Sequence, residues 1–272
     1  MNPRPAALVR ARLTALACTL LLFSGCLHRS PPPLVPAPQG AYATPEELLS
    51  AMRERGQALG ALRATGVLEV GRGIKRLRTR TVALVRRPAL LRFEMISLFE
   101  QPMSILVING MEFSLWNMEE GRFLTGPATQ DNISLVLPVP LDGPELAGLL
   151  LGEPPLCAYA SALLAWDESR GRYRLTLANA RQEQTLLVHP VTLRAERVLL
   201  REGGKTLYEL TIEEWKAATP PLPPVPQKLV LSMPERKIRV ALKLREVEIN
   251  PALGDSLFEL APPQNTPIEQ LP

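Results

Sequence analysis

The sequence predicts an α+β fold that is mostly β, and three features of the chain support this prediction. Short β-prone runs recur from residue 64 onward, separated by turns rich in Gly, Pro and Asn. One amphipathic helix precedes these runs, and a short apolar helix interrupts them. The chain has 272 residues, 46% of them hydrophobic and 5% aromatic, so aliphatic side chains must supply most of a sizeable core.

The first helix is expected over residues 45–62. The sequence TPEE at 44–47 is typical of a capping box, with Thr44 as the cap and Pro45 in the first turn. Apolar residues then recur at a spacing that keeps them roughly on one helical face: Leu48, Leu49, Met52, Leu59 and Leu62.

Antiparallel strands are expected on both sides of an insert in mid-chain. Asn109-Gly110 predicts a type I′ hairpin turn, in which both residues need positive φ. Before the insert, the β-prone runs are 67–70, 77–86, 90–97, 103–109, 111–117 and 121–125. After it they are 158–166, 171–179, 182–188, 191–201, 205–215 and two final runs around the turn at 234–236.

The insert at residues 131–152 has a different pattern. Pro138 and Pro140 exclude a central strand there. Asp142 is suited to cap a helix whose apolar body, residues 144–151, presents leucine or alanine on nearly every side. This helix must therefore be buried, or must cover another apolar surface.

The N-terminus has the pattern of an export signal. Residues 1–12 contain three Arg and no acid, and residues 13–25 contain no charge, which indicates a signal peptide over 1–25. The motif FSGC that follows is similar to the lipobox of bacterial lipoproteins. This resemblance implies that Cys26 receives a diacylglyceryl group and becomes the acylated first residue of the mature chain. An ordinary secretion signal or an uncut membrane anchor is the alternative.

The mature chain is expected to have three parts. Residues 26–44 contain the lipidated cysteine and five prolines, and they predict an extended tether between the membrane and the domain. Residues 45–263 form the domain, and residues 264–272 form a C-terminal tail. Leu27 occupies the position at which Asp favours inner-membrane retention in sorted lipoproteins. That resemblance implies a lipid-anchored protein of the outer membrane, on its periplasmic face.

Charge and cysteine content limit the classes of function. The formal net charge of +4 falls to about +1 once Arg4, Arg10 and Arg12 leave with the signal peptide (4 − 3). Nucleic acid is therefore not an expected partner, because its binding needs a basic excess. Cys157 is the one cysteine that remains after cleavage and acylation, so no intramolecular disulfide is expected.

Four segments, taken in order, resemble those of the LolA/LolB superfamily of lipoprotein carriers. They read ALRATGVLEV, RFEMISLFEQPMSILVINGMEFSLWNMEEGRFLTG, LPVPLDGPELAGLLLG and LREVEINPALGDSLFELAPP, and they are spread over about residues 45–263. The resemblance implies a curved antiparallel half-barrel sheet whose open face is covered by helices around an apolar cavity. The lipobox favours the membrane-bound LolB-like branch, although no functional residue of LolB can be aligned to this chain.

An acyl chain offers no hydrogen bonds, so its binding site needs only a dry concave surface and a cover. The residues expected to form this cavity and its cover are apolar residues of the strands and of the insert: Val67, Leu84, Phe93, Met95, Ile105, Val107, Phe113, Leu115, Leu146, Leu149, Leu150, Ile238, Val240, Leu242 and Leu244. The alternative is that the same side chains fill the interior as an ordinary core.

Catalysis is not expected. His189 is the one histidine of the domain, and a lone histidine next to a proline is more often structural. The sequence has neither the HExxH motif of zinc enzymes nor the GxSxG motif of serine hydrolases. Cys157 has no evident base beside it in the sequence and is expected to be a small buried residue. We therefore expect no catalytic residue, no metal and no cofactor.

Residues 72–92 contain eight Lys or Arg and no acid. For an exported lipoprotein, an anionic membrane surface is the partner that such a stretch suggests, and Arg76, Arg78 and Arg80 are the candidate contacts. The alternative is the solvated face of a hairpin.

Together these observations predict a monomeric lipoprotein anchored to membrane lipid through its acyl chains. It would hold lipid, or the acyl chains of another lipoprotein, and deliver them to the outer membrane, receiving them from a periplasmic carrier protein. The alternative is a structural or docking subunit of a cell-envelope assembly that uses the same fold.

Overall fold

A computed structural model describes residues 34–97 and 99–272. Val35–Pro272 form one compact unit that contains all the described strands and both described core clusters. A unit with its own hydrophobic core has what it needs to fold alone. The predicted signal peptide 1–25 and the predicted lipidation site Cys26 lie outside the described residues.

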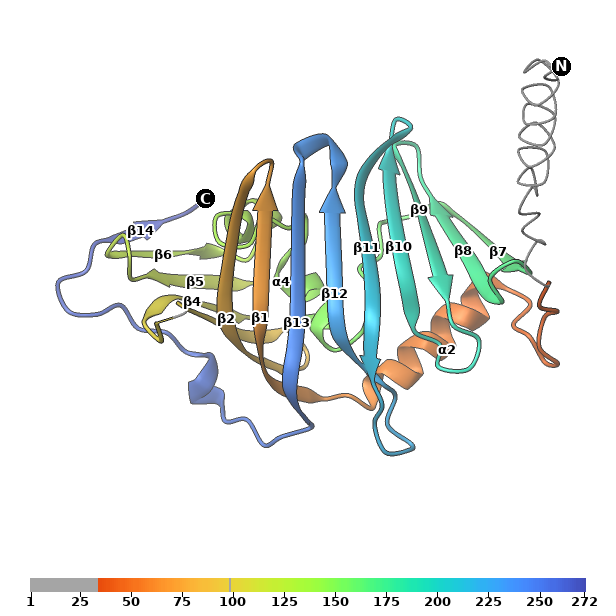
Figure 1. Ribbon diagram of the computed structural model, residues 1–272, viewed down its shortest axis with the longest axis horizontal. Coiled ribbons are helices and arrows are strands. Elements are labelled where there is room, and N and C mark those ends of the chain that lie inside the picture. The colour runs from red at the N-terminus through yellow and green to blue at the C-terminus, as the bar shows by residue number, and fades with distance from the viewer. Residues whose placement is uncertain (1–33, 98) are drawn as a thin grey trace, which may run out of the picture. The chain divides into compact units, whose positions relative to one another are not determined.

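The compact unit consists of one large sheet with few helices (Figure 1). The helices are α2 (Pro45–Gln57), α3 (Gln130–Ser134) and α4 (Gly143–Leu150), with two single turns of 3-10 helix, η1 (Pro234–Arg236) and η2 (Asp255–Phe258). The strands are β1 (Ala61–Arg72), β2 (Lys75–Arg86), β3 (Leu90–Ile96), β4 (Pro102–Asn109), β5 (Glu112–Asn117), β6 (Arg122–Pro127), β7 (Ser161–Asp167), β8 (Arg172–Ala178), β9 (Gln182–Val188), β10 (Ala195–Glu202), β11 (Lys205–Lys216), β12 (Val225–Met233), β13 (Ile238–Ile249) and β14 (Ile268–Gln270).

The sheet is curved and does not close on itself. Its strand order is β14-β6-β5-β4-β3-β2-β1-β13-β12-β11-β10-β9-β8-β7, and every neighbouring pair is antiparallel except β14 and β6. The pairing of β1 with β13 joins the strands before the insert to those after it. The predicted fold class, a mostly β half-barrel with helices over its open face, is confirmed.

The main core lies on the concave side of the sheet. Alternation along β3 shows this: Leu91, Phe93 and Met95 point into the main core, whereas Arg92 and Glu94 point outward and pair with each other. Leucines of α2 and α4 belong to the same core. In Figure 1 α4 lies behind the strands of the sheet.

The first helix begins as predicted but ends earlier. Thr44 accepts a hydrogen bond from the backbone N–H of Glu47, and the Glu47 carboxylate accepts one from the backbone N–H of Thr44, which forms the predicted capping box. The helix ends at Gln57 instead of residue 62. The Asn250 side chain accepts hydrogen bonds from the N–H groups of residues 60 and 61, so the chain enters β1 there.

The hairpin between β4 and β5 also differs from its prediction. Asn109 is paired with Glu112, which leaves Gly110 and Met111 as the two loop residues. Gly110 has a φ of 68°, and Asn109 is not among the residues with positive φ. A type I′ turn needs positive φ at both loop positions, and Met111 is not among the residues with positive φ, so the turn is of type II′ instead of the predicted type I′.

The last ten residues of the predicted tether lie against the sheet. The backbone N–H of Val35 donates to the Glu168 carbonyl (2.8 Å), and the Trp166 indole donates to the Val35 carbonyl (2.8 Å). The ring of Tyr42 meets Tyr173 edge to face, 5.8 Å between centroids. Residues 35–44 are therefore part of the compact unit, because these aromatic contacts hold them there.

The predicted C-terminal tail, residues 264–272, also belongs to the sheet. Its residues 268–270 form β14, which pairs in parallel with β6, and Leu271 contacts the main core. The domain thus extends beyond both of its predicted bounds.

A smaller core covers part of the outer face. Phe258 of η2 is 1% exposed and contacts Leu84 and Val107, which point outward from β2 and β4. The guanidinium of Arg86 lies over the Phe258 ring, 5.3 Å from its centroid. This part of the sheet is therefore buried on both faces.

We expect Phe258→Ala to lower the free energy of unfolding by about 3–5 kcal/mol, because it leaves a cavity under the C-terminal segment. Phe99→Ala is the matched control, since Phe99 is 87% exposed, and it should change stability by less than about 0.5 kcal/mol. Urea denaturation of residues 35–272 measures both values. Equal effects of the two substitutions would show that η2 does not stabilise the sheet.

Candidate functional site

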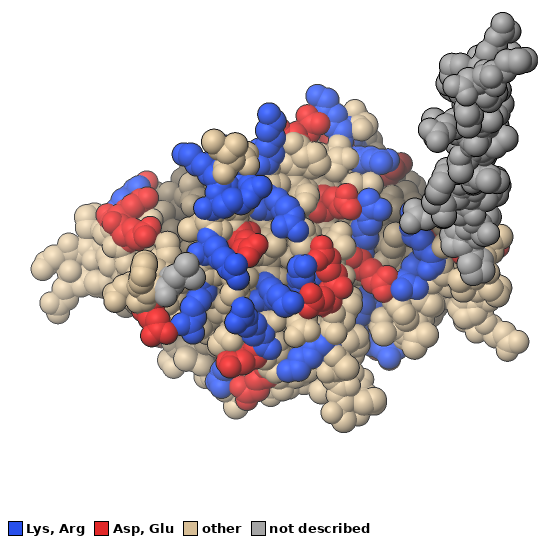
Figure 2. Space-filling view, viewed as in Figure 1, with Lys and Arg blue, Asp and Glu red and all other residues tan. Residues whose placement is uncertain are grey.

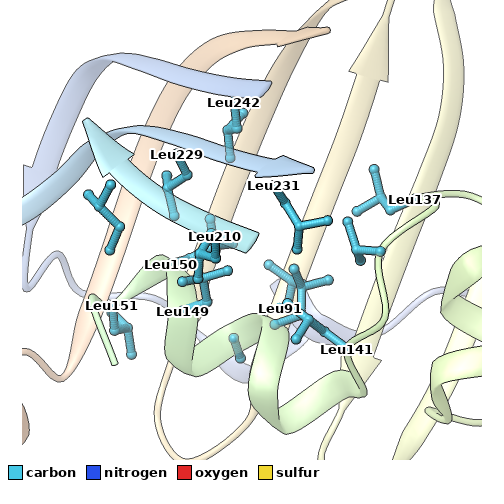
Figure 3. Packing of buried hydrophobic residues seen from close by; sticks show 14 of the residues in the cluster. Leu91, Leu137, Leu141, Leu149, Leu150, Leu151, Leu210, Leu229, Leu231 and Leu242 are labelled. Atoms are coloured by element: carbon cyan, nitrogen blue, oxygen red, sulfur yellow. The ribbon is translucent and has the colours of Figure 1, made fainter. Parts of the chain in front are cut away.

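An apolar cavity lies between the concave face of the sheet and the segment that joins β6 to β7. Residues 128–160, which we call the cover segment, contain α3 and α4. Leu149 and Leu150 of α4 face leucines of β11, β12 and β13 (Figure 3). Thirteen residues line the cavity, and all are aliphatic or aromatic: Leu68, Phe93, Leu137, Val139, Leu141, Leu146, Leu149, Leu150, Leu210, Leu229, Leu231, Val240 and Leu242.

The cavity is small. Its volume is about 50 Å³, whereas sites for small-molecule ligands usually measure about 300–1,000 Å³. On this scale it has room for a few water-sized spheres. The interior is therefore almost filled by the protein's own side chains in this conformation, and a longer guest needs the cover segment to move.

The structure divides the predicted cavity residues into three groups. Six of them line the cavity: Phe93, Leu146, Leu149, Leu150, Val240 and Leu242. Five others belong to the same core but do not line the cavity: Met95, Phe113, Leu115, Ile238 and Leu244.

The third group was wrongly placed. Leu84, Ile105 and Val107 point to the outer face, where they contact the smaller core around Phe258. Val67 also points outward, because its neighbour Leu68 occupies the concave side. In β2 and β4 both faces are covered by apolar residues, so alternation in the sequence does not distinguish inside from outside.

Seven residues of the cavity wall were not predicted. Leu68 had a usable signal, since it alternates with the charged Glu69. Leu210 lies in a strand with regular alternation, whereas Leu229 and Leu231 flank Val230, which is buried as well, so alternation does not assign a face there. The remaining three, Leu137, Val139 and Leu141, lie in the irregular part of the cover segment, where no periodicity exists to place them.

The middle of the cover segment contacts the sheet through apolar side chains. Within the described part of the chain, all hydrogen bonds of residues 133–151 are made to other residues of the cover segment. α4 satisfies its own N-terminus with a capping box between Asp142 and Glu145. Lifting this part away from the sheet would thus break no hydrogen bond between the two.

Polar side chains fix the end of the cover segment that leads to β7. Gln184, fully buried on β9, donates to the Pro155 carbonyl (3.0 Å) and accepts from the N–H of Cys157 (3.1 Å). Arg194, 3% exposed, donates to the carbonyls of Gly152 (3.0 Å) and Pro224 (3.2 Å). Burial lowers the pKa of Arg194 to about 10, so it is still a cation at neutral pH.

Arg87 connects the same end of the cover segment to the first helix. Its guanidinium donates to the carbonyls of Gly56 (3.0 Å) and Leu59 (2.7 Å) and pairs with the Glu153 carboxylate (2.6 Å). The side chain of Arg87 is 26% exposed and that of Glu153 is 32% exposed, so most of the pair is buried. The pair therefore holds α2, the start of β1 and the cover segment together.

The other end of the cover segment, next to β6, is fixed by Asn132. Its side-chain amide donates to the carbonyls of Pro127 (2.9 Å) and Pro272 (3.2 Å). The cover segment is therefore attached at both ends by directional bonds, and its middle is held by apolar contact. None of these polar anchors was predicted. For Gln184 a signal existed, because it is a polar residue in line with Leu186 and Val188 on a buried face.

The three arginines proposed as membrane contacts point outward from β2. Arg78 pairs with Glu69 (3.5 Å) and Arg80 pairs with Glu100 (2.7 Å). Both line an open groove of about 490 Å³ on the outer face. Arg76 has no acidic partner among the described residues and donates to backbone carbonyls of its own turn. Figure 2 shows that this face carries charges of both signs.

The residues considered for chemistry have structural surroundings. His189 accepts hydrogen bonds at Nδ1 from the N–H groups of Val191 and Thr192 (3.2 Å each), and burial lowers its pKa. Cys157 is a half-buried free thiol whose pKa is raised by burial. Within residues 34–97 and 99–272, three or more His, Cys, Asp or Glu side chains nowhere come together as metal ligands would. No described helix has the length and apolarity needed to cross a bilayer.

Comparison with known proteins gives matches in structure alone. No family model matches the chain, and no curated protein matches its sequence. A putative outer membrane lipoprotein-sorting protein domain from Vibrio parahaemolyticus superposes with a TM-score of 0.57 at 12% identity, over 78% of this chain and 94% of that one. A LolA superfamily protein from Nitrosomonas europaea gives 0.55 at 11% identity, over 78% and 97%. A DUF1329 family protein from Desulfovibrio piger gives 0.57 at 11% identity, over 79% and 96%.

At these identities the likeness establishes the architecture and no activity. The curved open sheet and the helices on its concave side are also what the order of the four sequence segments predicted. The chain has the same architecture as these solved structures, one of which is a LolA superfamily protein.

Proposed function

We propose that this chain is a lipid-anchored protein of the outer membrane, facing the periplasm, that binds acyl chains of lipid or of another lipoprotein beneath its cover segment and passes them to the membrane. Binding and release are exchanges of apolar contact, and no bond is made or broken. The protein is accordingly not an enzyme. A periplasmic carrier would supply the cargo.

One observation carries this proposal: the cover segment is attached by hydrogen bonds at its ends and by apolar contact alone between them. An acyl chain can take the place of Leu146, Leu149 and Leu150 against the sheet without leaving any hydrogen bond unmade. Each methylene that leaves water contributes about 0.8 kcal/mol. A chain of roughly twelve methylenes thus contributes on the order of 10 kcal/mol, which offsets the loss of the contacts between cover and sheet.

The place of action is inferred from the N-terminus. The signal-peptide pattern and the FSGC motif support acylation at Cys26, and Leu27 supports transfer to the outer membrane. The structural likeness to a protein described as a putative outer membrane lipoprotein-sorting domain agrees with this assignment. Two or more acyl chains are needed for stable anchoring, which a lipoprotein's N-terminal cysteine provides.

We expect residues 35–272 to bind cis-parinaric acid, a fluorescent long-chain fatty acid, saturably and in a 1:1 ratio, and to bind hexanoate not measurably. Leu149→Ala should lower the free energy of unfolding by about 2–5 kcal/mol without the probe, and by clearly less with it, because the acyl chain fills the space that the leucine leaves. Fluorescence titration and urea denaturation measure the two effects.

Leu62→Ala is the matched control, because Leu62 is fully buried in the same core but does not line the cavity. Its stability loss should be the same with and without the probe. Absence of saturable binding would refute the proposed function. Equal rescue of both variants would place the probe elsewhere on the protein.

We expect Glu153→Gln to speed the uptake of the probe about fivefold, because it removes the ion pair with Arg87 while keeping the size of the side chain. We assign this pair, whose side chains are 26% and 32% exposed, a contribution of roughly 1 kcal/mol, which corresponds to that factor. Glu248→Gln, which removes the pair with Arg63 on the outer face, should leave the uptake rate unchanged. Stopped-flow fluorescence measures the rates, and equal acceleration in both variants would show that the anchor at Glu153 does not limit the movement of the cover segment.

The small size of the cavity supports a second candidate function, a docking subunit of an envelope assembly. β7 has no neighbour on its outer edge among the described residues, and its Leu163 is 66% exposed. A strand edge of this kind, whose one charged residue, Asp167, is buried at its end, is suited to pairing with another chain. Native mass spectrometry distinguishes the two functions, since bound lipid supports the carrier and a stoichiometric protein partner supports the docking subunit.

A further inference from the structure

Two hairpin turns lie side by side at one end of the sheet. The β1–β2 turn consists of residues 72–75, and the β12–β13 turn of residues 234–237. In the strand register Arg72 of β1 lies opposite Ile238 of β13, and the N–H of Gly73 donates to the carbonyl of Lys237 (3.0 Å). We call residues 72–78 and 234–239 together the paired tips (Figure 1).

The paired tips carry a large excess of positive charge. They contain seven cationic side chains and one acid, Glu235, which gives a net charge of +6 (7 − 1). The cations are Arg72, Lys75, Arg76, Arg78, Arg236, Lys237 and Arg239, all of them exposed. Among the described residues, Arg78 alone of these seven has an ion-pair partner, Glu69 at 3.5 Å. Figure 2 shows Lys and Arg side chains gathered at this end of the molecule.

An aliphatic side chain projects from the middle of this charge. Ile74, at the end of the β1–β2 turn, is 99% exposed, and Leu77 is 45% exposed. Along the rest of β1, β12 and β13 most cations are paired: Arg63, Lys228 and Lys243 each have a carboxylate within 3.1 Å, whereas Arg245 has no ion-pair partner among the described residues. The unpaired cations and the exposed isoleucine thus occur together at the paired tips.

The paired tips are also continuous with the cavity wall. Leu77, Val70 and Val240 lie opposite one another in a row across β2, β1 and β13. Leu77 is at the exposed end of this row, Val70 contacts the main core, and Val240 lines the cavity. An apolar path therefore connects the exposed tip to the cavity along the concave face.

We propose that the paired tips bind the surface of an anionic lipid bilayer, with Ile74 inserted among the headgroups and the cations against the phosphates. Charge complementarity selects this partner, because cations without acidic partners are stabilised near an anionic membrane surface. In this orientation the exposed end of the apolar row faces the bilayer. The direction in which cargo moves rests on the proposed function, whereas the binding of the bilayer does not.

The paired tips differ from the membrane contact predicted from the sequence. Of Arg76, Arg78 and Arg80, the last lies away from the turns and is paired with Glu100 on the outer face. The structure instead adds Arg236, Lys237 and Arg239, which are more than 150 residues away in sequence and next to the β1–β2 turn in space. A tertiary contact thus makes one basic surface from two short segments.

The test is flotation of residues 35–272, which lack the acyl anchor, with vesicles of equal parts phosphatidylglycerol and phosphatidylcholine. We expect Arg72→Glu/Lys75→Glu to weaken vesicle binding about 30-fold or more, since each basic residue near such a surface contributes about a fivefold gain. Arg53→Glu/Arg181→Glu is the control of equal charge: both are exposed cations outside the paired tips, without an ion-pair partner among the described residues. It should change binding by less than about threefold.

Ile74→Ser should weaken vesicle binding roughly tenfold, because the aliphatic contact with the bilayer is lost. Val191→Ser is its control, since Val191 is 69% exposed in the turn between β9 and β10, outside the paired tips. All four variants should bind cis-parinaric acid in solution like the unmodified protein. A loss of vesicle binding therefore distinguishes this proposal from the proposed function.

Three results would overturn the proposal. One is equal vesicle binding by the tip variants and their controls. Another is equal binding of the unmodified protein to vesicles of phosphatidylcholine alone. The third concerns Arg72→Glu/Lys75→Glu: if this variant lost binding to polyglutamate but still bound vesicles, the partner of the paired tips would be an acidic protein instead.

Discussion

The apolar contact between the concave face of the sheet and the cover segment is the constraint on which the rest of the structure depends. An open sheet has no second sheet against which to bury its inner face, so helices must cover it. Here α4 covers the leucines of β11–β13, and the polar groups at its two ends bond to residues of the cover segment itself. The same lack of directional bonds that lets the cover segment form this core also lets an apolar guest compete for it.

The sheet forms one wall of the cavity, and its outer face is covered differently in its two halves. Over β2–β4 the C-terminal segment buries the outer face through Phe258, so the strands there are held from both sides. Over β11–β13 the outer face is solvated and carries ion pairs. Three polar side chains fix the end of the cover segment that leads to β7 to the sheet: Gln184, Arg194 and Arg87. Movement is thereby confined to the part that has no bond to the sheet.

Most of the fold follows from local signals in the sequence, and much of the site does not. Alternation placed most of the strands, and the capping residues Thr44 and Asp142 placed the starts of α2 and α4, because backbone geometry determines both; α3 and β14 were not predicted. Alternation predicts which side of the sheet a residue faces only where one face is solvated. Val240 was therefore assigned correctly, whereas Leu84 was not, because both faces of the sheet are buried there. The size of the cavity and the pairing of Arg87 with Glu153 depend on packing between distant segments, which no local pattern encodes.

The position of the basic paired tips at the end of the apolar row has a physical reason. A chain of roughly twelve methylenes that crossed from the cavity to a bilayer through water would lose on the order of 10 kcal/mol of favourable transfer free energy. If the exposed end of the row, at Leu77, lies against the headgroups, the chain exchanges one apolar environment for another and avoids most of this barrier. Electrostatic attraction is suited to hold this arrangement, because it orients the molecule without occupying the apolar path. In the transfer that we propose, the charge at the paired tips would orient the molecule, and the absence of polar bonds under the cover segment would let the cargo enter and leave.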